Sequence, residues 1–117
     1  MAITNLDLLK EYASGDVNFM LELLSIYKNE TPKAIEQIKF HTGQQNWSEL
    51  KMVIHKLKSS VSMLGINQLA HTISKMEQNI KTENNTLETI NLSYDLIEQC
   101  QISVSEVDHH IQNLIAS

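Results

Sequence analysis

The hydrophobic positions of this chain recur with the spacing of amphipathic helices. In the clearest series the steps alternate between four and three residues, which places five apolar side chains on one helix face: Leu50, Ile54, Leu57, Val61 and Leu64. Few segments alternate between apolar and polar residues in the way that strands do. The pattern therefore predicts an all-α fold.

Breaker and capping residues divide the pattern into five predicted helices, at about residues 6–12, 16–42, 46–65, 66–81 and 86–115. Pro32 falls inside the second helix, where it either kinks one long helix or, after Thr31, begins a new one. Short loops make sequential helices antiparallel neighbours. We therefore expect an antiparallel up-down-up-down four-helix bundle with a short extra N-terminal helix.

Several local features of these helices can be predicted. Asp16 is an N-cap for the second helix, and Glu49, three residues after Asn46, gives the third a capping-box-like start. Gly65 stands where a left-handed residue would close the third helix. The second helix should face inward through Val17, Met20, Leu21, Leu24 and Tyr27. The last helix should face inward through Leu87, Ile90, Tyr94, Ile97, Val104, Ile111 and Leu114.

Length and composition indicate one ordinary domain. The 117 residues are most simply a single domain, 1–117, which can bury roughly two-thirds of its unfolded surface. Cys100 is the only cysteine, so no internal disulfide can form and a reducing compartment is suitable. We find neither a signal peptide nor an apolar run near the roughly 20 residues of a membrane span. The expectation is a soluble cytoplasmic monomer with no membrane partner.

Charge is distributed unevenly along the chain. The net charge is −5, and all nine basic residues are lysines. Because arginine is the usual reader of guanine edges and phosphates, nucleic-acid binding is not expected. Residues 50–76 contain four lysines and no acid, whereas the chain after Lys81 contains six acids and no lysine. This basic segment suggests an anionic partner or adduct, although a solvated helix with a chance run of lysines would look the same.

One histidine of the third helix lies off the apolar face. The helical neighbours of His55, at three, four and seven residues, are small or basic: Lys51, Lys58, Ser59 and Ser62. A solvent-exposed helix face with two ammonium groups and small side chains suits a histidine that carries a phosphoryl group and is approached by another protein. A histidine on a helix is, however, more commonly an ordinary surface or capping residue.

The remaining histidines and the cysteine give no metal or nucleophilic site, and none is predicted. His109 and His110 are adjacent and point about 100° apart, while His41 and His71 lack partners at metal-ligand spacing. Cys100 has no basic neighbour and is expected to be an inert, semi-buried thiol. A metal- or cofactor-binding bundle would use inward Glu and Glu-x-x-His sets on facing helices. We expect no Glu-x-x-His set in this chain, and that alternative is therefore disfavoured.

The chain resembles the histidine-containing phosphotransfer (HPt) domains of two-component phosphorelays. The family motif, His-x-x-Lys-Gly with a glycine ten residues after the histidine, matches His55, Lys58, Ser59 and Gly65, with serine in place of the first glycine. The similarity extends to the segments 12–19, 47–50, 65–69 and 74–77. It covers roughly residues 5–85, and the last helix matches only in kind.

The resemblance implies a role for each matched residue. His55 is the phosphoacceptor, and Lys58 neutralises the phosphoryl oxygens. Ser59 and Ser62 keep the face clear for a docking receiver domain. Independently of the motif, Lys51 and Met52 lie beside His55 on the helix, and we expect them to be further docking contacts. Gly65 lets the third helix end tightly against the fourth. Serine at position 59 narrows the approach to the imidazole without blocking it.

The function implied is that of a phosphorelay carrier. Imidazole is largely neutral and nucleophilic at cytoplasmic pH, and it would attack an aspartyl phosphate in line. The partners would be response-regulator receiver domains, which bring the Mg²⁺, and a hybrid sensor histidine kinase. The chain has no cofactor of its own and no ATP-binding loop, so it would not be a kinase or other enzyme. The alternative is a helical adaptor that binds a signalling partner through the His55 face without phosphotransfer.

Overall fold

The computed structural model describes residues 2–116 as an α-helical bundle without strands. Its helices are α1 (Asp7–Tyr12), α2 (Val17–Gly43), α3 (Trp47–Met63), α4 (Asn67–Lys81) and α5 (Thr86–Ala116). These bounds agree with the predicted helices to within a few residues. Pro32 lies inside α2, which continues through it as one helix.

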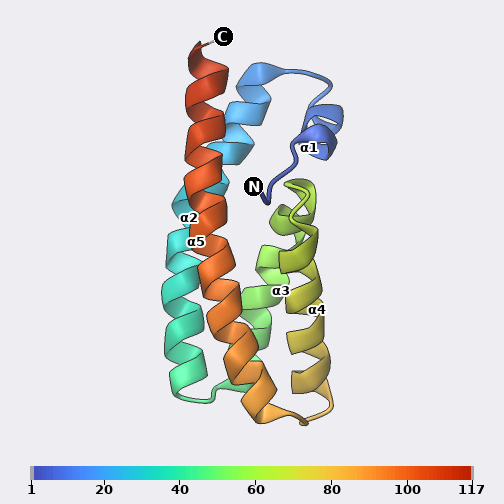
Figure 1. Ribbon diagram of the computed structural model, residues 1–117, viewed down its shortest axis with the longest axis vertical. Helices are drawn as coiled ribbons and strands as arrows, with labels where there is room; N and C mark the ends of the chain where they lie inside the picture. The colour runs from blue at the N-terminus through green and yellow to red at the C-terminus, as the bar shows by residue number, and fades with distance from the viewer. Residues whose placement is uncertain (1, 117) are drawn as a thin grey trace.

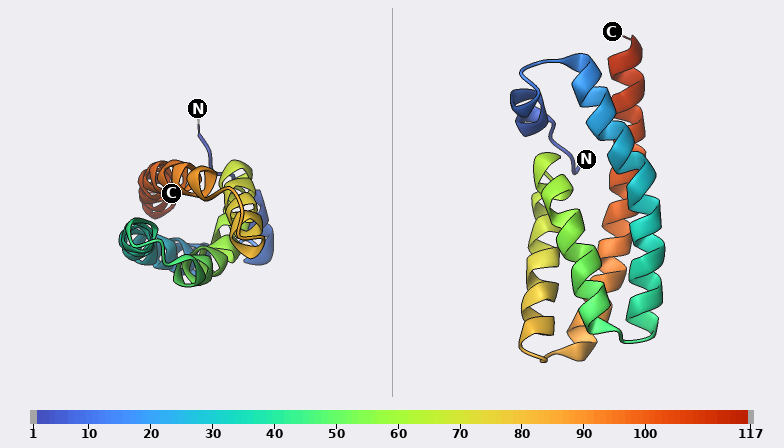
Figure 2. Two further views of the ribbon diagram at one scale, coloured as in Figure 1. Left: turned by 90° about the horizontal axis from the view of Figure 1, so that it is seen from below. Right: turned by 180° about the vertical axis from the view of Figure 1, so that it is seen from behind.

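The four long helices form a closed ring of antiparallel neighbours. Helix α2 packs against α3 and α5, and α4 packs against α3 and α5 (Figures 1 and 2). Helices α2 and α5 extend beyond the other two, and short α1 lies above the turn between α3 and α4 (Figure 1). The predicted up-down-up-down architecture is therefore confirmed. No helix within residues 2–116 is both long enough and apolar enough to span a bilayer.

The apolar series of α3 faces the core as predicted. Leu50, Ile54 and Val61 are fully buried, and Leu57 is nearly so. Opposite them, α4 buries Leu69, Ile73 and Met76. Burying side chains of this size stabilises a fold by roughly 1.5–3 kcal/mol each. This packing fixes the rotation of α3, and so decides which of its residues face solvent.

The predicted inward face of α5 is partly wrong. Leu87 and Tyr94 are 72% and 61% exposed, while Ile97 and Ile111 are buried as expected. The buried face also includes polar residues whose hydroxyls bond to carbonyls three or four residues earlier in the chain: Thr89, Ser93 and Ser103. Because these buried hydroxyls have hydrogen-bond partners, small polar residues can replace apolar ones at the core, which an apolar pattern cannot reveal. Val17 of α2 is likewise exposed rather than inward.

The predicted caps have different outcomes. Asp16 accepts a hydrogen bond from the Phe19 amide, as an N-cap should. The capping box at Asn46 is not formed, because the Asn46 side chain makes no capping bond and its amide donates to the His41 carbonyl. That bond occupies the amide which Glu49 would otherwise accept from.

Gly65 closes α3 in the left-handed conformation that its position predicts, with φ of +65°. The amides of Gly65 and Ile66 donate to Ser62 and Val61, which is a Schellman closure. The N-terminal segment crosses this turn: the Asn5 amide donates to the Leu64 carbonyl. A Cβ on Gly65 would come within 2.7 Å of the Asn5 oxygen, so the turn needs glycine for space as well as for conformation.

The same N-terminal segment is tied to α5 by Glu106. Its carboxylate accepts hydrogen bonds from the amides of Ile3 and Thr4 and from the Thr4 hydroxyl. The Thr4 hydroxyl also lies 2.8 Å from Nε2 of His110, so His110 contacts the same segment. The segment thus connects α5 to the α3–α4 turn.

Candidate phosphoacceptor site on helix α3

His55 lies in the middle of α3 and projects outward. Its side chain is 73% exposed, while its neighbours Ile54 and Leu57 are buried. The outward direction follows from the packing of the apolar series, because His55 lies off the face of the amphipathic helix that this series turns toward the core. The imidazole is therefore open to a large reactant.

A carboxylate from α4 binds both His55 and Lys58. Glu77 Oε2 lies 2.9 Å from Nδ1 of His55, and Glu77 Oε1 lies 3.1 Å from Nζ of Lys58. The Glu77 side chain is only 16% exposed. Partial burial raises the pKa of Glu77, but the hydrogen bonds and charges of His55 and Lys58 outweigh this effect and hold its pKa below the usual value. Glu77 is consequently ionised at neutral pH.

The ionised carboxylate determines the tautomer of the histidine. A carboxylate can only accept, so Nδ1 of His55 is the donor. In the neutral ring, Nε2 then carries the free lone pair, and Nε2 makes no hydrogen bond to the described residues. The nitrogen that keeps its lone pair is thus the one that Glu77 does not bind, on a side chain that is 73% exposed.

The surroundings of His55 are open. Ser59 and Ser62 are exposed, Lys51 is half-buried, and Met52 is 67% exposed. The predicted site residues that lie in α3 thus all have some surface on the helix that carries the imidazole. Lys58 is half-buried and is held by Glu77 rather than pointing freely into solvent.

Glu77 is the site residue that sequence reasoning missed. The basic segment ends at Met76, one residue before Glu77, so the site looked free of acids along the chain. A usable signal was present: His55 lies ten residues before Gly65 and Glu77 twelve after it. In an antiparallel hairpin with a rise of about 1.5 Å per residue, those positions lie at nearly the same height.

The other residues considered from the sequence give no second site. Cys100 is fully buried, more than the semi-buried thiol predicted, and burial raises its pKa to about 12. Helix α5 contains one Glu-x-x-His, from Glu106 to His109, but Glu106 binds the N-terminal segment. Within residues 2–116, no three His, Cys, Asp or Glu side chains gather as metal ligands.

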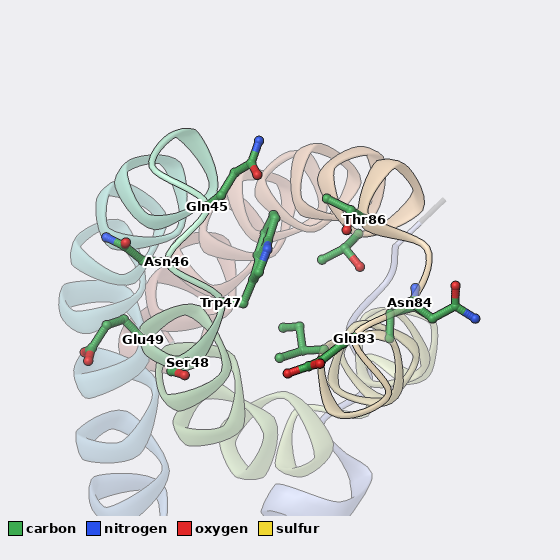
Figure 3. A pocket seen from close by; sticks show the side chains of 11 residues that line it. Gln45, Asn46, Trp47, Ser48, Glu49, Glu83, Asn84 and Thr86 are labelled. Atoms are coloured by element: carbon green, nitrogen blue, oxygen red, sulfur yellow. The ribbon is translucent and has the colours of Figure 1, made fainter.

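A cavity of about 570 Å³ lies at the opposite end of the bundle from α1. Figure 3 shows Trp47 on one wall and Glu83 on the other, below the start of α5 at Thr86. Trp47 precedes His55 by eight residues, or about 12 Å along the helix axis. None of the predicted site residues lines this cavity, so it is separate from the candidate site around His55.

Comparison with known proteins identifies the class of protein. The model of the Hpt domain family matches residues 22–116. The fold matches that of the HPT domain from a sensor hybrid histidine kinase of Shewanella, with a TM-score of 0.84, 21% sequence identity and coverage of 95% of both chains. A search of curated proteins found no match. The chain belongs to the Hpt domain family.

Family membership establishes the general activity. Hpt domains are histidine phosphotransfer carriers of two-component phosphorelays, and they interact with receiver domains and histidine kinases. The family is one of carriers and not of kinases.

Proposed function

We propose that His55 accepts a phosphoryl group from the phospho-aspartate of one receiver domain and passes it to the aspartate of another. The observation that carries this proposal is the state of the ring, which is 73% exposed, with Nδ1 bonded to Glu77 and Nε2 without a hydrogen bond to any of residues 2–116. A hybrid sensor histidine kinase is the proposed origin of the phosphoryl group.

The chemistry requires little from this chain beyond position and charge. Nε2 attacks phosphorus in line, the N–P bond forms, and the P–O bond to the donor aspartate breaks so that a carboxylate leaves. The transferring group develops negative charge on its equatorial oxygens. We assign Lys58 to these oxygens, with Lys51 adding positive potential. We assign the Mg²⁺ to the receiver domain. Mg²⁺ binds carboxylate and phosphate oxygens, and the phospho-aspartate of the receiver offers both.

The proposed docking surface surrounds His55 and consists of Lys51, Met52, Ser59 and Ser62. Met52 gives it an exposed apolar contact, and the serines leave the imidazole accessible. The surface continues into a groove of about 490 Å³ between α2 and α3, where Met52 and Ile26 form part of the wall. A receiver domain that covers His55 would therefore also meet apolar surface, which supports docking there.

The test is phosphoryl transfer from a radiolabelled phospho-receiver to the full chain. Wild-type protein should take up label as an acid-labile phosphohistidine, and His55→Gln should take up none while its circular dichroism is unchanged. His71→Gln, an exposed histidine of α4, is the matched control and should be labelled normally. Label retained in His55→Gln would refute the assignment. Receiver binding without label in the wild type would instead favour the adaptor function.

A further inference from the structure

The cavity at the end of the bundle opposite α1 has no part in the proposed phosphotransfer. It is formed where α3 and α5 begin and α4 ends, and its volume of about 570 Å³ lies within the range of small-molecule sites. Figure 3 shows Trp47 extending into it, with Glu83 across from Trp47 and Thr86 on a third side. An aromatic ring and a carboxylate thus face one enclosed space.

We propose that this cavity binds a protonated primary amine, with the ammonium group between the Trp47 ring and the Glu83 carboxylate. A cation over an aromatic face is attracted by the quadrupole of the ring, and tryptophan gives the strongest attraction of this kind. The carboxylate on the other side accepts a charge-assisted hydrogen bond from the same cation. This binding does not depend on the role of His55, because no docking residue lines the cavity.

The side chains that line the cavity carry only negative charge. Glu83 and Glu49 are among them, whereas no lysine or histidine is. Figure 3 shows Glu49 directed toward α2, so Glu49 adds negative potential at the rim and leaves Glu83 as the contact. Lys75, one turn before the lining residue Asn79, is paired with Glu88 at 3.8 Å. The charge of the lining therefore favours a cation.

The helix ends at the cavity do not favour an anion instead. Helices α3 and α5 begin at this end of the bundle, and α2 and α4 end there (Figure 1). The N-terminus of a helix attracts anions and its C-terminus attracts cations, by similar amounts. Two ends of each kind largely cancel, so the side chains decide the sign of the charge that binds.

The wall of the cavity also offers a hydrogen-bond acceptor. Asn79 lines the cavity, is only 8% exposed, and donates from its side-chain nitrogen to Oε1 of Glu88. Its Oδ1 makes no hydrogen bond within residues 2–116 and is not among the atoms enclosed by protein. Glu83 follows Asn79 by four residues, or about one helical turn. An ammonium group has three donors and can bond to both side chains together.

The test uses the fluorescence of Trp47, which is the only tryptophan of the chain and so reports on this cavity. The full chain is titrated with butylammonium chloride at constant ionic strength. Butanol, which has the same alkyl chain without the charge, and sodium chloride are the matched controls. ¹H–¹⁵N NMR follows the Trp47 indole and the Asn79 side-chain amide in parallel. We expect a saturable response of both groups to butylammonium, and none to butanol or sodium chloride.

Replacing Glu83 with glutamine keeps the shape of the side chain and removes its charge. Glu83→Gln should weaken butylammonium binding by about tenfold, because a hydrogen bond to a charged acceptor is lost. Glu98→Gln, which removes an exposed acid of α5, should bind like wild type. A response that does not saturate, that butanol reproduces, or that has the same dissociation constant in Glu83→Gln would overturn the inference.

The ammonium group can belong to a free amine or to a lysine of a partner protein. Nα-acetyl-lysine N-methylamide carries the same group on a peptide unit and distinguishes the two sources. Binding as tight as that of butylammonium, or tighter, assigns the cavity to a partner's lysine. Weaker binding, which means that the peptide unit obstructs entry, assigns it to a free amine.

Discussion

Nδ1 of His55 and Oε2 of Glu77 lie 2.9 Å apart, on different helices. The same carboxylate also binds Lys58, so one side chain of α4 orients two side chains of α3. The orientation of the imidazole therefore depends on the packing of α3 against α4. Substitutions that shift either helix should therefore change the orientation of the His55 ring, even where the substituted residue does not contact the ring.

Replacing Lys58 with alanine should slow phosphoryl transfer by about tenfold, because one positive charge is lost where negative charge develops. The rate is measured by single-turnover transfer from a phospho-receiver. Lys10→Ala, which removes an exposed lysine of α1, is the control and should transfer normally. Equal rates for wild type, Lys58→Ala and the control variant would show that Lys58 takes no part in the transfer.

Replacing Ser59 with glutamate should weaken receiver binding by about tenfold or more, because it adds bulk and negative charge one turn from the imidazole. Titration calorimetry with an unphosphorylated receiver measures the dissociation constant. Ser105→Glu on α5 introduces the same charge on another exposed position and should bind like wild type. An unchanged constant for Ser59→Glu would show that this face is not the interface.

Replacing Gly65 with alanine should destabilise the fold by about 1–3 kcal/mol. The φ of +65° is unfavourable for alanine, and its Cβ would meet the Asn5 oxygen at 2.7 Å. Urea unfolding followed by circular dichroism measures the change. Gly43→Ala is the matched control, because that glycine is helical and has open space at its Cβ; it should be neutral or stabilising. Equal losses at both positions would contradict the close approach of Asn5.

Glu106 should make stability depend on pH in the acid range. Partial burial raises the pKa of Glu106. The hydrogen bonds from Thr4 and Ile3 and the charge of His110 together lower it by more, so the net pKa is depressed. A depressed folded pKa gives stability that is present above the ordinary value of 4.5 and is lost as the pH falls through the folded pKa.

The measurement is the free energy of unfolding between pH 7 and 3 for wild type and Glu106→Gln. The variant should be less stable at pH 7 and should lose less stability on acidification, so the two curves should converge at low pH. Glu98→Gln should parallel wild type. Parallel curves for wild type and Glu106→Gln would show that the carboxylate does not hold the N-terminal segment.

The sequence was sufficient for the helices and for the exposed position of His55. The apolar series from Leu50 to Leu64 marks the inward face of α3, and a helix with one apolar face leaves its other residues in solvent. The left-handed conformation of Gly65 was likewise predicted, because the residue that closes a helix in this way is usually glycine. These features depend on contacts within a few residues of each other.

Other features were decided only by the tertiary structure. The inward face of α5 was misassigned at Leu87 and Tyr94, because buried serine and threonine hydroxyls bond to carbonyls three or four residues earlier and leave no apolar signal. The capping box expected at Asn46 was replaced by a bond to the preceding turn. The spacing of apolar residues predicts neither outcome.

The pairing of Glu77 with His55 and Lys58 belongs to the same group. The chain itself determined which residues of α3 face solvent, since helical periodicity acts over three or four residues. It did not by itself bring a carboxylate to Nδ1, since that contact joins residues 22 positions apart and depends on how two helices pack. The local pattern placed the imidazole on the surface, and the α3–α4 packing selected its tautomer.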